Sequence, residues 1–282
     1  GTSGTFTVTD DDVTDTHSVS FSNGTSSHGS FLGFFQVGFD DPISGDGSGV
    51  VAWEFAIGDP LPAGTQDSQM AIVDALADGE TIVQTYTVTV TETNTGPSSE
   101  TFTQTVTVTI EGTNDAPVIS GTAVAAPVTE VVDDGITDQT LSATGTLNVA
   151  DTDTSDEVTV DVTSVDVAGA STFTGMTPDN ATLLAMMQVV AGDGATGTPG
   201  TDTGAMTADE TAGSDFTWAF SAGDVSSSPF DFLRSGETIV LEYTLTATDD
   251  SGAGVDETDT QVVTITITGT NDVPVIAVDS NN

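Results

Sequence analysis

The sequence predicts an all-β protein built from tandem β-sandwich modules with one short helical insert. The segment Gly-Thr-Asn-Asp-Ala-Pro-Val-Ile at residues 112–119 returns as Gly-Thr-Asn-Asp-Val-Pro-Val-Ile at residues 269–276, so the chain contains a duplicated unit. Apolar residues alternate with threonine in several stretches, a pattern typical of strands with one buried face. Clusters of Gly, Asp, Ser and Asn separate these stretches and indicate turns.

The duplication extends well upstream of these two segments. Gly-Glu-Thr-Ile-Val at residues 79–83 returns at residues 236–240. Further matched pairs are Gly4 and Gly145, Trp53 and Trp218, and Tyr86 and Tyr243. An internal repeat of this length indicates an array of stacked modules and argues against an enzyme.

The strongest strand patterns lie at Tyr86 and Tyr243 and in the segments that follow them. Residues 86–91 and 105–110 alternate apolar residues with threonine in the first copy, and residues 242–248 and 261–268 do so in the second. One face of each strand is expected to pack while the other meets water. A single helix is predicted over residues 178–188, where Asp179 or Asn180 can cap the first turn.

The repeat also sets the expected domain boundaries. Residues 116–144 have no counterpart ahead of Gly4, so the first copy is expected to start partway through a module. We therefore predict a first module at residues 1–115 that lacks its opening strand, and a second module at residues 116–272. Residues 273–282 would be the opening strand of a following module.

The charge balance is extreme. The chain has 44 acidic residues and one basic residue, Arg234, which gives a net charge of −43. Such self-repulsion destabilises a compact state unless cations or salt offset it. Nucleic acid and anionic membranes are disfavoured as partners, because phosphate contacts require the missing Lys and Arg. High charge also suits a disordered chain, but the 36 % hydrophobic content and regular strand pattern argue against disorder.

The absence of cysteine and of long apolar runs excludes several kinds of site and segment. The sequence contains no cysteine, which removes disulfides, thiolate nucleophiles and zinc–thiolate sites. No apolar run approaches the roughly 20 residues of a membrane-spanning helix.

At this point several motifs point to a family. Trp-x-Phe occurs at residues 53–55 and 218–220, Ala-Leu-Ala-Asp-Gly-Glu-Thr at 75–81, and Tyr-Thr-Val-Thr-Val at 86–90. Together with the closing Gly-Thr-Asn-Asp-Ala-Pro-Val-Ile, they resemble the VCBS repeats of very large secreted bacterial adhesins. The resemblance covers both copies and implies an extracellular, cell-surface β-sandwich module.

The placing of the acidic residues is similar to that in cadherin repeats, which are Greek-key, immunoglobulin-like modules holding Ca²⁺ at each junction. For the junction between the two copies, the resemblance implies the ligands Asp78, Glu80, Asn114, Asp115, Glu130, Asp151, Asp153 and Asp249. At the outer ends of the copies, the matching positions are Asp10, Asp12, Glu237, Asn271 and Asp272. The linker at residues 114–117 is one residue shorter than a cadherin linker, Gly112 replaces its leading Asp, and Ser235 replaces an Asp of the second turn. Fewer ions per junction than in cadherins are therefore expected.

Calcium chemistry is compatible with these residue types, because Ca²⁺ takes six to eight oxygens from carboxylates, amides, backbone carbonyls and water. Binding of the ion is expected to stiffen the junction more than it builds the core of either module. The alternative for any one of the 44 acids is a solvated turn residue, and this alternative holds for most of them.

Other motifs carry less weight. Residues 192–197 fit Gly-x-Gly-x-x-Gly but lack the strand and helix of a dinucleotide site. The acidic runs at residues 10–12 and 151–156 lack the Gly and Glu of an EF-hand loop. The two tryptophans recur at equivalent strand positions, which favours core anchors over a sugar-stacking platform. We assign no catalytic residue and expect the chain not to be an enzyme.

These observations lead to one expected function and two alternatives. We expect a calcium-stiffened spacer in a bacterial surface adhesin or fibre, partnered by neighbouring modules or by copies of itself. Residues 273–282 of one copy would complete the first module of the next by strand exchange, giving a head-to-tail filament. Alternatively, inserts at residues 39–51 and 193–215 would bind a cell-surface glycan or protein. The chain could also be an accessory region of a secreted hydrolase.

Overall fold

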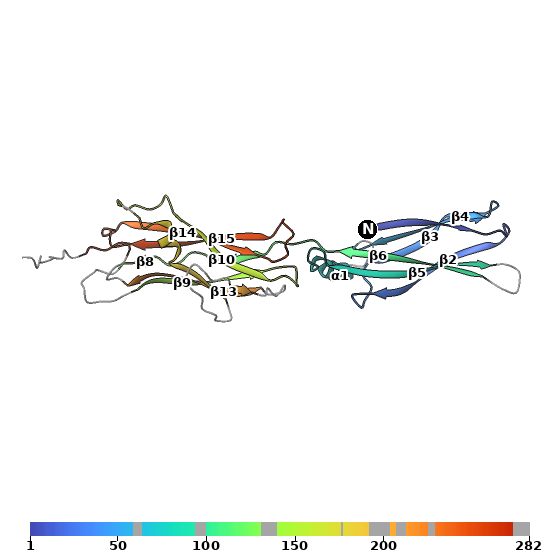
Figure 1. The fold of residues 1–282 in the computed structure, drawn as a ribbon, viewed down its shortest axis with the longest axis horizontal. Coiled ribbons are helices and arrows are strands. Elements are labelled where there is room, and N and C mark those ends of the chain that lie inside the picture. Colours follow the sequence, from blue (N-terminus) through green and yellow to red (C-terminus); the bar gives the residue numbers. More distant parts are fainter. Residues whose placement is uncertain are drawn as a thin grey trace, which may run out of the picture. The chain divides into compact units, whose positions relative to one another are not determined.

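The computed structural model describes residues 1–58, 64–93, 100–130, 140–175, 177–191, 204–206, 213–224 and 229–272. The chain divides into two compact units, Gly1–Thr113 and Asn114–Asn282, each made mainly of β-strands (Figure 1). The boundary falls inside the repeated Gly-Thr-Asn-Asp segment. The predicted all-β class is confirmed.

Unit 1 is a sandwich of two antiparallel sheets. One sheet has the order β1-β4-β3 and the other the order β2-β5-β6. The strands are β1 (Thr2–Thr9), β2 (Thr16–Ser26), β3 (Phe34–Ser44), β4 (Ser48–Ala56), β5 (Thr81–Thr93) and β6 (Thr101–Glu111). Buried and less buried residues alternate along β5, as the threonine alternation predicts.

Unit 2 has two larger sheets, with the orders β12-β10-β14-β15-β8 and β11-β13-β9-β7. The opening strands are β7 (Val118–Gly121) and β8 (Val128–Thr129), followed by β9 (Thr140–Ala150) and β10 (Val158–Val167). The remaining strands are β11 (Met187–Ala191), β12 (Gly204–Met206), β13 (Ser214–Asp224), β14 (Thr238–Thr248) and β15 (Thr258–Thr268).

The opening segment of unit 2 joins both of its sheets. β7 pairs antiparallel with β9, and β8 then pairs parallel with β15. Between them, the Thr264 amide donates to the Ala123 carbonyl at 3.0 Å. This segment therefore covers one edge of each sheet.

The helical prediction was partly right. Helix α2 (Asn180–Leu184) lies within the predicted range, and Asp179 caps it by accepting a 2.8 Å hydrogen bond from the Thr182 amide. Continuation of the helix to residue 188 was wrong, because Met187 begins β11 and pairs with Phe220 of β13. Helix α1 (Thr65–Asp74) in unit 1 was not predicted, and none of its residues is buried.

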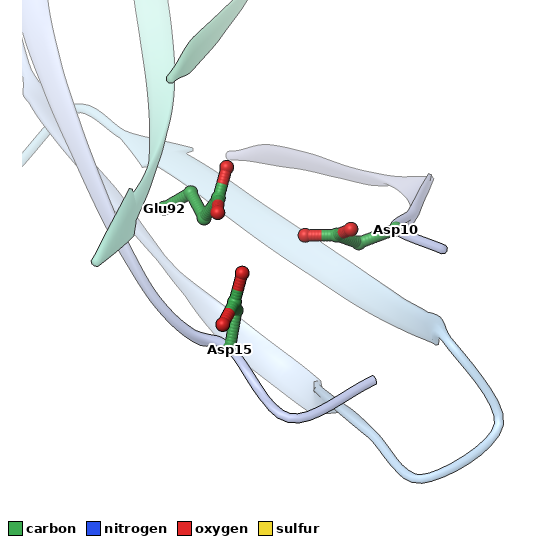
Figure 2. A group of neighbouring side chains, drawn as sticks. All are labelled: Asp10, Asp15 and Glu92. Atoms are coloured by element: carbon green, nitrogen blue, oxygen red, sulfur yellow. The ribbon is translucent and has the colours of Figure 1, made fainter. Parts of the chain in front are cut away.

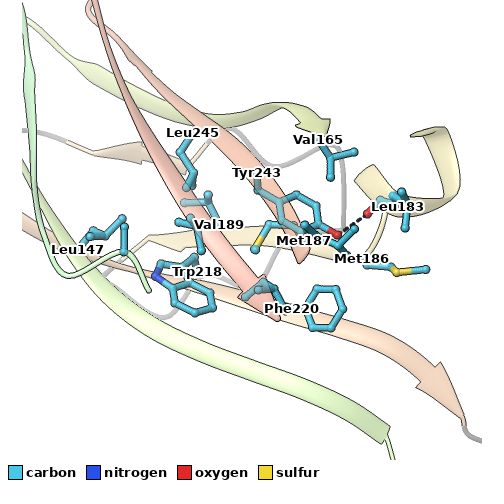
Figure 3. Packing of buried hydrophobic residues seen from close by; sticks show 14 of the residues in the cluster. Leu147, Val165, Leu183, Met186, Met187, Val189, Trp218, Phe220, Tyr243 and Leu245 are labelled. Atoms are coloured by element: carbon cyan, nitrogen blue, oxygen red, sulfur yellow. Dashed lines mark hydrogen bonds between the residues drawn. The ribbon is translucent and has the colours of Figure 1, made fainter. Parts of the chain in front are cut away.

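Aromatic residues form the centre of each core. In unit 2, Trp218, Phe220 and Tyr243 pack together, and the Tyr243 hydroxyl donates to the Leu183 carbonyl at 2.9 Å (Figure 3). Trp218 lies over Gly145, where an added Cβ would come within 2.4 Å of the indole ring. The prediction of a core anchor is confirmed for Trp218, which is 1 % exposed.

The unit 1 core has the same aromatic arrangement, but its tryptophan is less buried. Phe35 and Tyr86 stack with ring centroids 4.1 Å apart, and Phe35 also stacks with Trp53, with centroids 5.9 Å apart. Trp53 lies over Gly4 as Trp218 lies over Gly145. Trp53 is only partly buried, however, so the side of unit 1 next to β1 is less well covered.

Some expectations concern segments that lie outside the described residues. These are the Gly-rich motif at residues 192–197, most of the insert at residues 193–215, and the opening strand expected at residues 273–282. Within the described part of the chain, no helix has the length and apolar character needed to cross a bilayer.

Candidate metal sites

Five buried polar residues gather at one end of unit 2. Each lies just outside a strand: Asn114 precedes β7, Asp151 and Asp153 follow β9, Asp156 precedes β10, and Asp249 follows β14. Strand pairing brings these ends together, because Val118 of β7 pairs with Ala150 and Thr248 of β14 pairs with Thr159 of β10. We call these five residues the acidic cluster of unit 2. Their exposure lies between 0 % and 9 %.

Hydrogen bonds hold the entering chain against this cluster. The Asn114 Nδ2 donates to Asp249 Oδ2 at 3.2 Å and to the Asp256 carbonyl at 2.8 Å. The Asp115 amide donates to Asp153 Oδ2 at 2.7 Å. The Asp153 amide in turn donates to Asp151 Oδ1 at 3.0 Å. These bonds fix the side chains in one arrangement.

Several oxygens of the cluster have no donor. Asn114 Oδ1, Asp151 Oδ2, Asp153 Oδ1 and Asp156 Oδ2 are buried without a hydrogen-bond partner in the structure. A buried charged oxygen that lacks a partner is costly. A cation bound between these side chains would remove that cost.

Burial and mutual repulsion both act on the carboxyl groups of the cluster. Burial raises the pKa of Asp151 and of Asp153, and the neighbouring carboxylates raise both further. The pKa of Asp156 rises to about 6, first because of burial and then because of Asp153 and Asp249. Like charges held together in a buried site shift carboxyl groups in this direction when no cation is present.

Glu130 belongs to the opposite end of unit 2, so its predicted grouping with Asp151 and Asp249 was wrong. Its amide donates to the Thr268 carbonyl, and its Oε2 accepts from the Thr270 amide at 3.3 Å. β14 has 11 residues, so at about 3.4 Å per residue its two ends lie roughly 34 Å apart. Because β8 runs parallel to β15, it carries Glu130 to the end where β15 finishes.

Glu130 is 2 % exposed, and its Oε1 has no hydrogen-bond partner. Burial, followed by the charges of Asp272 and Asp231, raises its pKa to about 7. Glu237 lies at the same end, just before β14, and its Oε2 accepts from the Arg234 amide at 3.0 Å. Asn271 follows β15 and bonds to the Asp272 carbonyl. The structure thus brings Glu130, Glu237, Asn271 and Asp272 to one end of unit 2.

Asp78 and Glu80 lie at the end of unit 1 where β6 finishes. Glu80 Oε2 accepts from the Ala77 amide at 3.3 Å, and the Glu80 carbonyl accepts from the Gly112 amide at 2.9 Å. Asp78 is exposed in the turn before β5. A role for these two residues as Ca²⁺ ligands stays a prediction.

The other end of unit 1 carries a second acidic group. One carboxylate oxygen from each of Asp10, Asp15 and Glu92 lies within 4.8 Å of the others (Figure 2). Asp10 Oδ2 is 2.7 Å from His17 Nε2. The Asp12 amide donates to Asp10 Oδ1, and this bond, followed by His17, lowers the pKa of Asp10. The Asp12 side chain, which the sequence suggested, is not part of this group.

The two acidic groups occupy equivalent places in the repeat. Asp10 and Asp15 have the same spacing as Asp151 and Asp156, and Glu92 follows Tyr86 at the distance at which Asp249 follows Tyr243. The sequence prediction omitted Asp15, Glu92 and Asp156. Their matching positions in the two copies were the signal that could have identified them.

No protein-family model matches the chain, and no curated protein matches its sequence. Among solved structures, the chain is similar to the cadherin-like domains 1 to 4 of zebrafish RET, with 10 % identity and a TM-score of 0.25 over 92 % of this chain and 42 % of that one. It is also similar to CfaE, the adhesive subunit of the CFA/I fimbria of enterotoxigenic Escherichia coli, with 13 % identity and a TM-score of 0.35 over 81 % and 65 %. A third similar structure is mouse cadherin-23 EC22-24, with 11 % identity and a TM-score of 0.31 over 89 % of this chain and 53 % of that one.

The chain therefore spans between 42 % and 65 % of the length of these three structures. Scores this low support no inference about the chemistry of this chain. The assignment of its metal sites depends on its own residues.

Proposed function

We propose that the chain is a calcium-binding structural segment of an extracellular adhesive protein, with modules of the VCBS kind found in bacterial surface adhesins. The observation that supports this most directly is the acidic cluster of unit 2. Four of its buried oxygens have no hydrogen-bond partner, and the described part of the chain places no Lys or Arg side chain in an ion pair with them.

The donor set suits Ca²⁺ better than a transition metal. Asp151, Asp153, Asp156 and Asp249 offer carboxylate oxygens, and Asn114 offers an amide oxygen. Calcium prefers such all-oxygen sites, whereas thiolates and imidazoles select softer ions. The cluster contains neither cysteine nor histidine.

The position of the cluster gives the ion a mechanical role. Asn114 and Asp115 are the first residues of unit 2, and their bonds reach Asp249 and Asp153. An ion held by Asp153 and Asp249 would fasten the entry of the chain to the body of the sandwich. We expect bound Ca²⁺ to order this entering segment more than it stabilises the hydrophobic core, because the core is formed by other residues.

Two weaker sites complete the proposal. The group of Asp10, Asp15 and Glu92 repeats the cluster in unit 1, and Glu130, Glu237, Asn271 and Asp272 offer oxygens at the far end of unit 2. Both groups are more open than the cluster. They are expected to bind Ca²⁺ more weakly, in the millimolar range of many extracellular modules.

Isothermal titration of the metal-free protein with Ca²⁺ tests the proposal. The chain should show one tight site, and Asp153→Asn should abolish it or weaken it at least tenfold. Asp166→Asn removes the same charge from an exposed position of β10 and should leave the tight site intact. Equal loss in the two variants would show that the ions only screen the net charge.

A further inference from the structure

Strand β2 of unit 1 stands at the edge of its sheet. It pairs with β5, and no described residue of unit 1 pairs with its other side. In unit 2 the equivalent strand, β10, pairs with β14 on one side and with β12 on the other. β12 comes from the segment between β11 and β13, whereas the equivalent strands β3 and β4 of unit 1 are joined by a short turn at residues 45–47. An extended segment therefore fits this edge, and the hairpin of unit 1 has no counterpart to β12.

The bonding of β5 shows which backbone groups of β2 are open. The Glu92 amide donates to the Glu100 carbonyl at 3.0 Å, so Glu92 faces β6. Bonding directions alternate along an antiparallel strand, so the preceding residue, Thr91, bonds to its partner Ser18 in β2. Every second residue of β2 therefore bonds inside the sheet. The residues between them direct N–H and C=O to the open side, and these are His17, Val19, Phe21 and Asn23.

Apolar side chains lie along the same edge. Phe21 is 41 % exposed, although its ring packs edge-on against Phe35 of the core with centroids 5.0 Å apart. Val19, two residues earlier on the same face of β2, is only partly buried. A strand added beside β2 would cover both side chains, because directly opposed residues have Cβ atoms about 5 Å apart.

The charge of this edge favours a second copy of the chain over a basic partner. Residues 16–39 contain no Asp or Glu, although the chain has 44 acidic residues. A basic partner would find no carboxylate along this run, whereas two copies with a net charge of −43 each repel least where acids are absent. Antiparallel pairing also carries Asp15 of one copy past Asn23 of the other. The acidic ends of the two strands therefore stay apart.

We propose that β2 pairs antiparallel with β2 of a second copy, about a twofold axis at Ser20. In this register Val19 of each copy lies opposite Phe21 of the other, so each phenyl ring gains an apolar neighbour. Each of these pairs also exchanges both of its open backbone bonds. Main-chain pairing supplies affinity in such strand addition, and the side chains supply specificity. The contact is isologous, so it closes as a dimer and does not propagate.

Neighbouring registers match the side chains less well. A shift by two residues in one direction places Phe21 opposite His17, whose Nε2 is 2.7 Å from a carboxylate oxygen of Asp10. A shift in the other direction places Val19 opposite Asn23. Either shift leaves an apolar side chain facing a polar one, so the register with Ser20 on the axis is expected.

Cysteine cross-linking tests this register, because the chain has no native cysteine. Ser20 faces Ser20 in a non-hydrogen-bonded pair, where the Cα atoms lie about 4.5 Å apart and a disulfide can form. On oxidation, Ser20→Cys should give at least roughly tenfold more covalent dimer than Ser18→Cys, whose two copies lie about 14 Å apart. Ser18→Cys mixed with Ser22→Cys should restore the cross-link. Equal yields from Ser20→Cys and Ser18→Cys would overturn the proposal.

Sedimentation of the whole chain is the second measurement. The wild type should form a concentration-dependent dimer that strengthens with added salt, because salt screens the repulsion between copies. Val19→Pro removes an N–H on the open side, where a monomer tolerates proline, and should weaken the dimer roughly tenfold or more. Thr103→Pro makes the same change at the open edge of β6 and should alter dimerisation less than about threefold. A monomeric wild type overturns the proposal, as does a dimer that weakens with salt or survives Val19→Pro.

Calcium binding is measured separately from this contact. Asp153→Asn should dimerise as the wild type does, because the acidic cluster belongs to unit 2 and β2 to unit 1. Loss of the tight Ca²⁺ site with dimerisation intact, or the reverse, therefore distinguishes failure of one proposal from failure of the other.

Discussion

Replacement of Asp153 by Asn should change stability in opposite directions with and without calcium. Asp153 is 0 % exposed, its Oδ2 accepts the Asp115 amide, and its Oδ1 has no partner. Asparagine keeps an oxygen for the Asp115 amide but carries no charge. In the metal-free protein the substitution removes a buried charge whose pKa burial has already raised, so the metal-free variant should be more stable than the metal-free wild type.

With calcium the sign reverses. At 100 times its dissociation constant, Ca²⁺ stabilises the folded state by about 2.7 kcal/mol. Loss of one of a few carboxylate ligands weakens such a site by roughly one to two decades. At the same calcium concentration, a 30-fold weaker site contributes only about 0.9 kcal/mol, so the contribution of calcium falls by about 1.8 kcal/mol. Removal of the buried charge offsets part of this loss.

Urea unfolding followed by tryptophan fluorescence measures both effects, because Trp218 lies in the core of unit 2. The wild type, Asp153→Asn and Asp166→Asn are compared in calcium and in chelator. Asp166 is exposed on β10, so its variant should follow the wild type within about 0.5 kcal/mol in both conditions. If Asp153→Asn destabilises the protein equally with and without calcium, Asp153 is a structural residue and not a ligand.

Three further predictions concern the same unit. The pKa of Glu130 is raised from 4.5 to about 7, so in chelator the stability that its protonated form confers is present below pH 4.5 and is lost as the pH rises through 7. The free energy of unfolding in urea should fall between pH 5 and 8 by on the order of 2 kcal/mol through this group, and Glu130→Gln should make the pH dependence smaller. Gly145→Ala should lower stability by about 1–3 kcal/mol in thermal unfolding, because its Cβ would meet the Trp218 ring, while Gly169→Ala, with open space around it, should not. Tyr243→Phe removes a buried hydroxyl that bonds to a carbonyl of α2 and should cost about 1–3 kcal/mol by the same assay.

Much of the fold follows from local pattern. The threonine alternation identifies β5, β6, β14 and β15 because each has one buried face, and burial with period two needs no knowledge of the partner strand. The end of α2 could not be predicted in this way. Met187 fits a helical run locally, but pairing with Phe220 places it in a strand. Helix α1 was missed because none of its residues is buried, so it leaves no strong apolar stripe.

The sequence predicted those residues of the candidate site that belong to recognisable repeated motifs. Asp151, Asp153, Asp249 and Asn114 were named from motifs, and the structure brings these four together. Glu130 was misplaced because chain order does not show which end of a sheet a short parallel strand reaches. That direction depends on β8 pairing with β15, a contact between residues far apart in the sequence.

The opening segment of unit 2 also determines how this unit responds to pulling. Unit 2 begins at Asn114, which donates to the Asp256 carbonyl beside the start of β15, and its last described residue, Asp272, lies just past the end of β15. Since β8 runs parallel to β15, tension on these two points draws the strands past one another along their length. This tension loads several backbone hydrogen bonds at the same time, so they do not open one after another. These are the bonds of Ala123 and Ala125 to Thr264 and of Glu130 to Thr268. Resistance to extension should therefore be concentrated in this one lateral contact, and single-molecule stretching should show unit 2 rupturing there first.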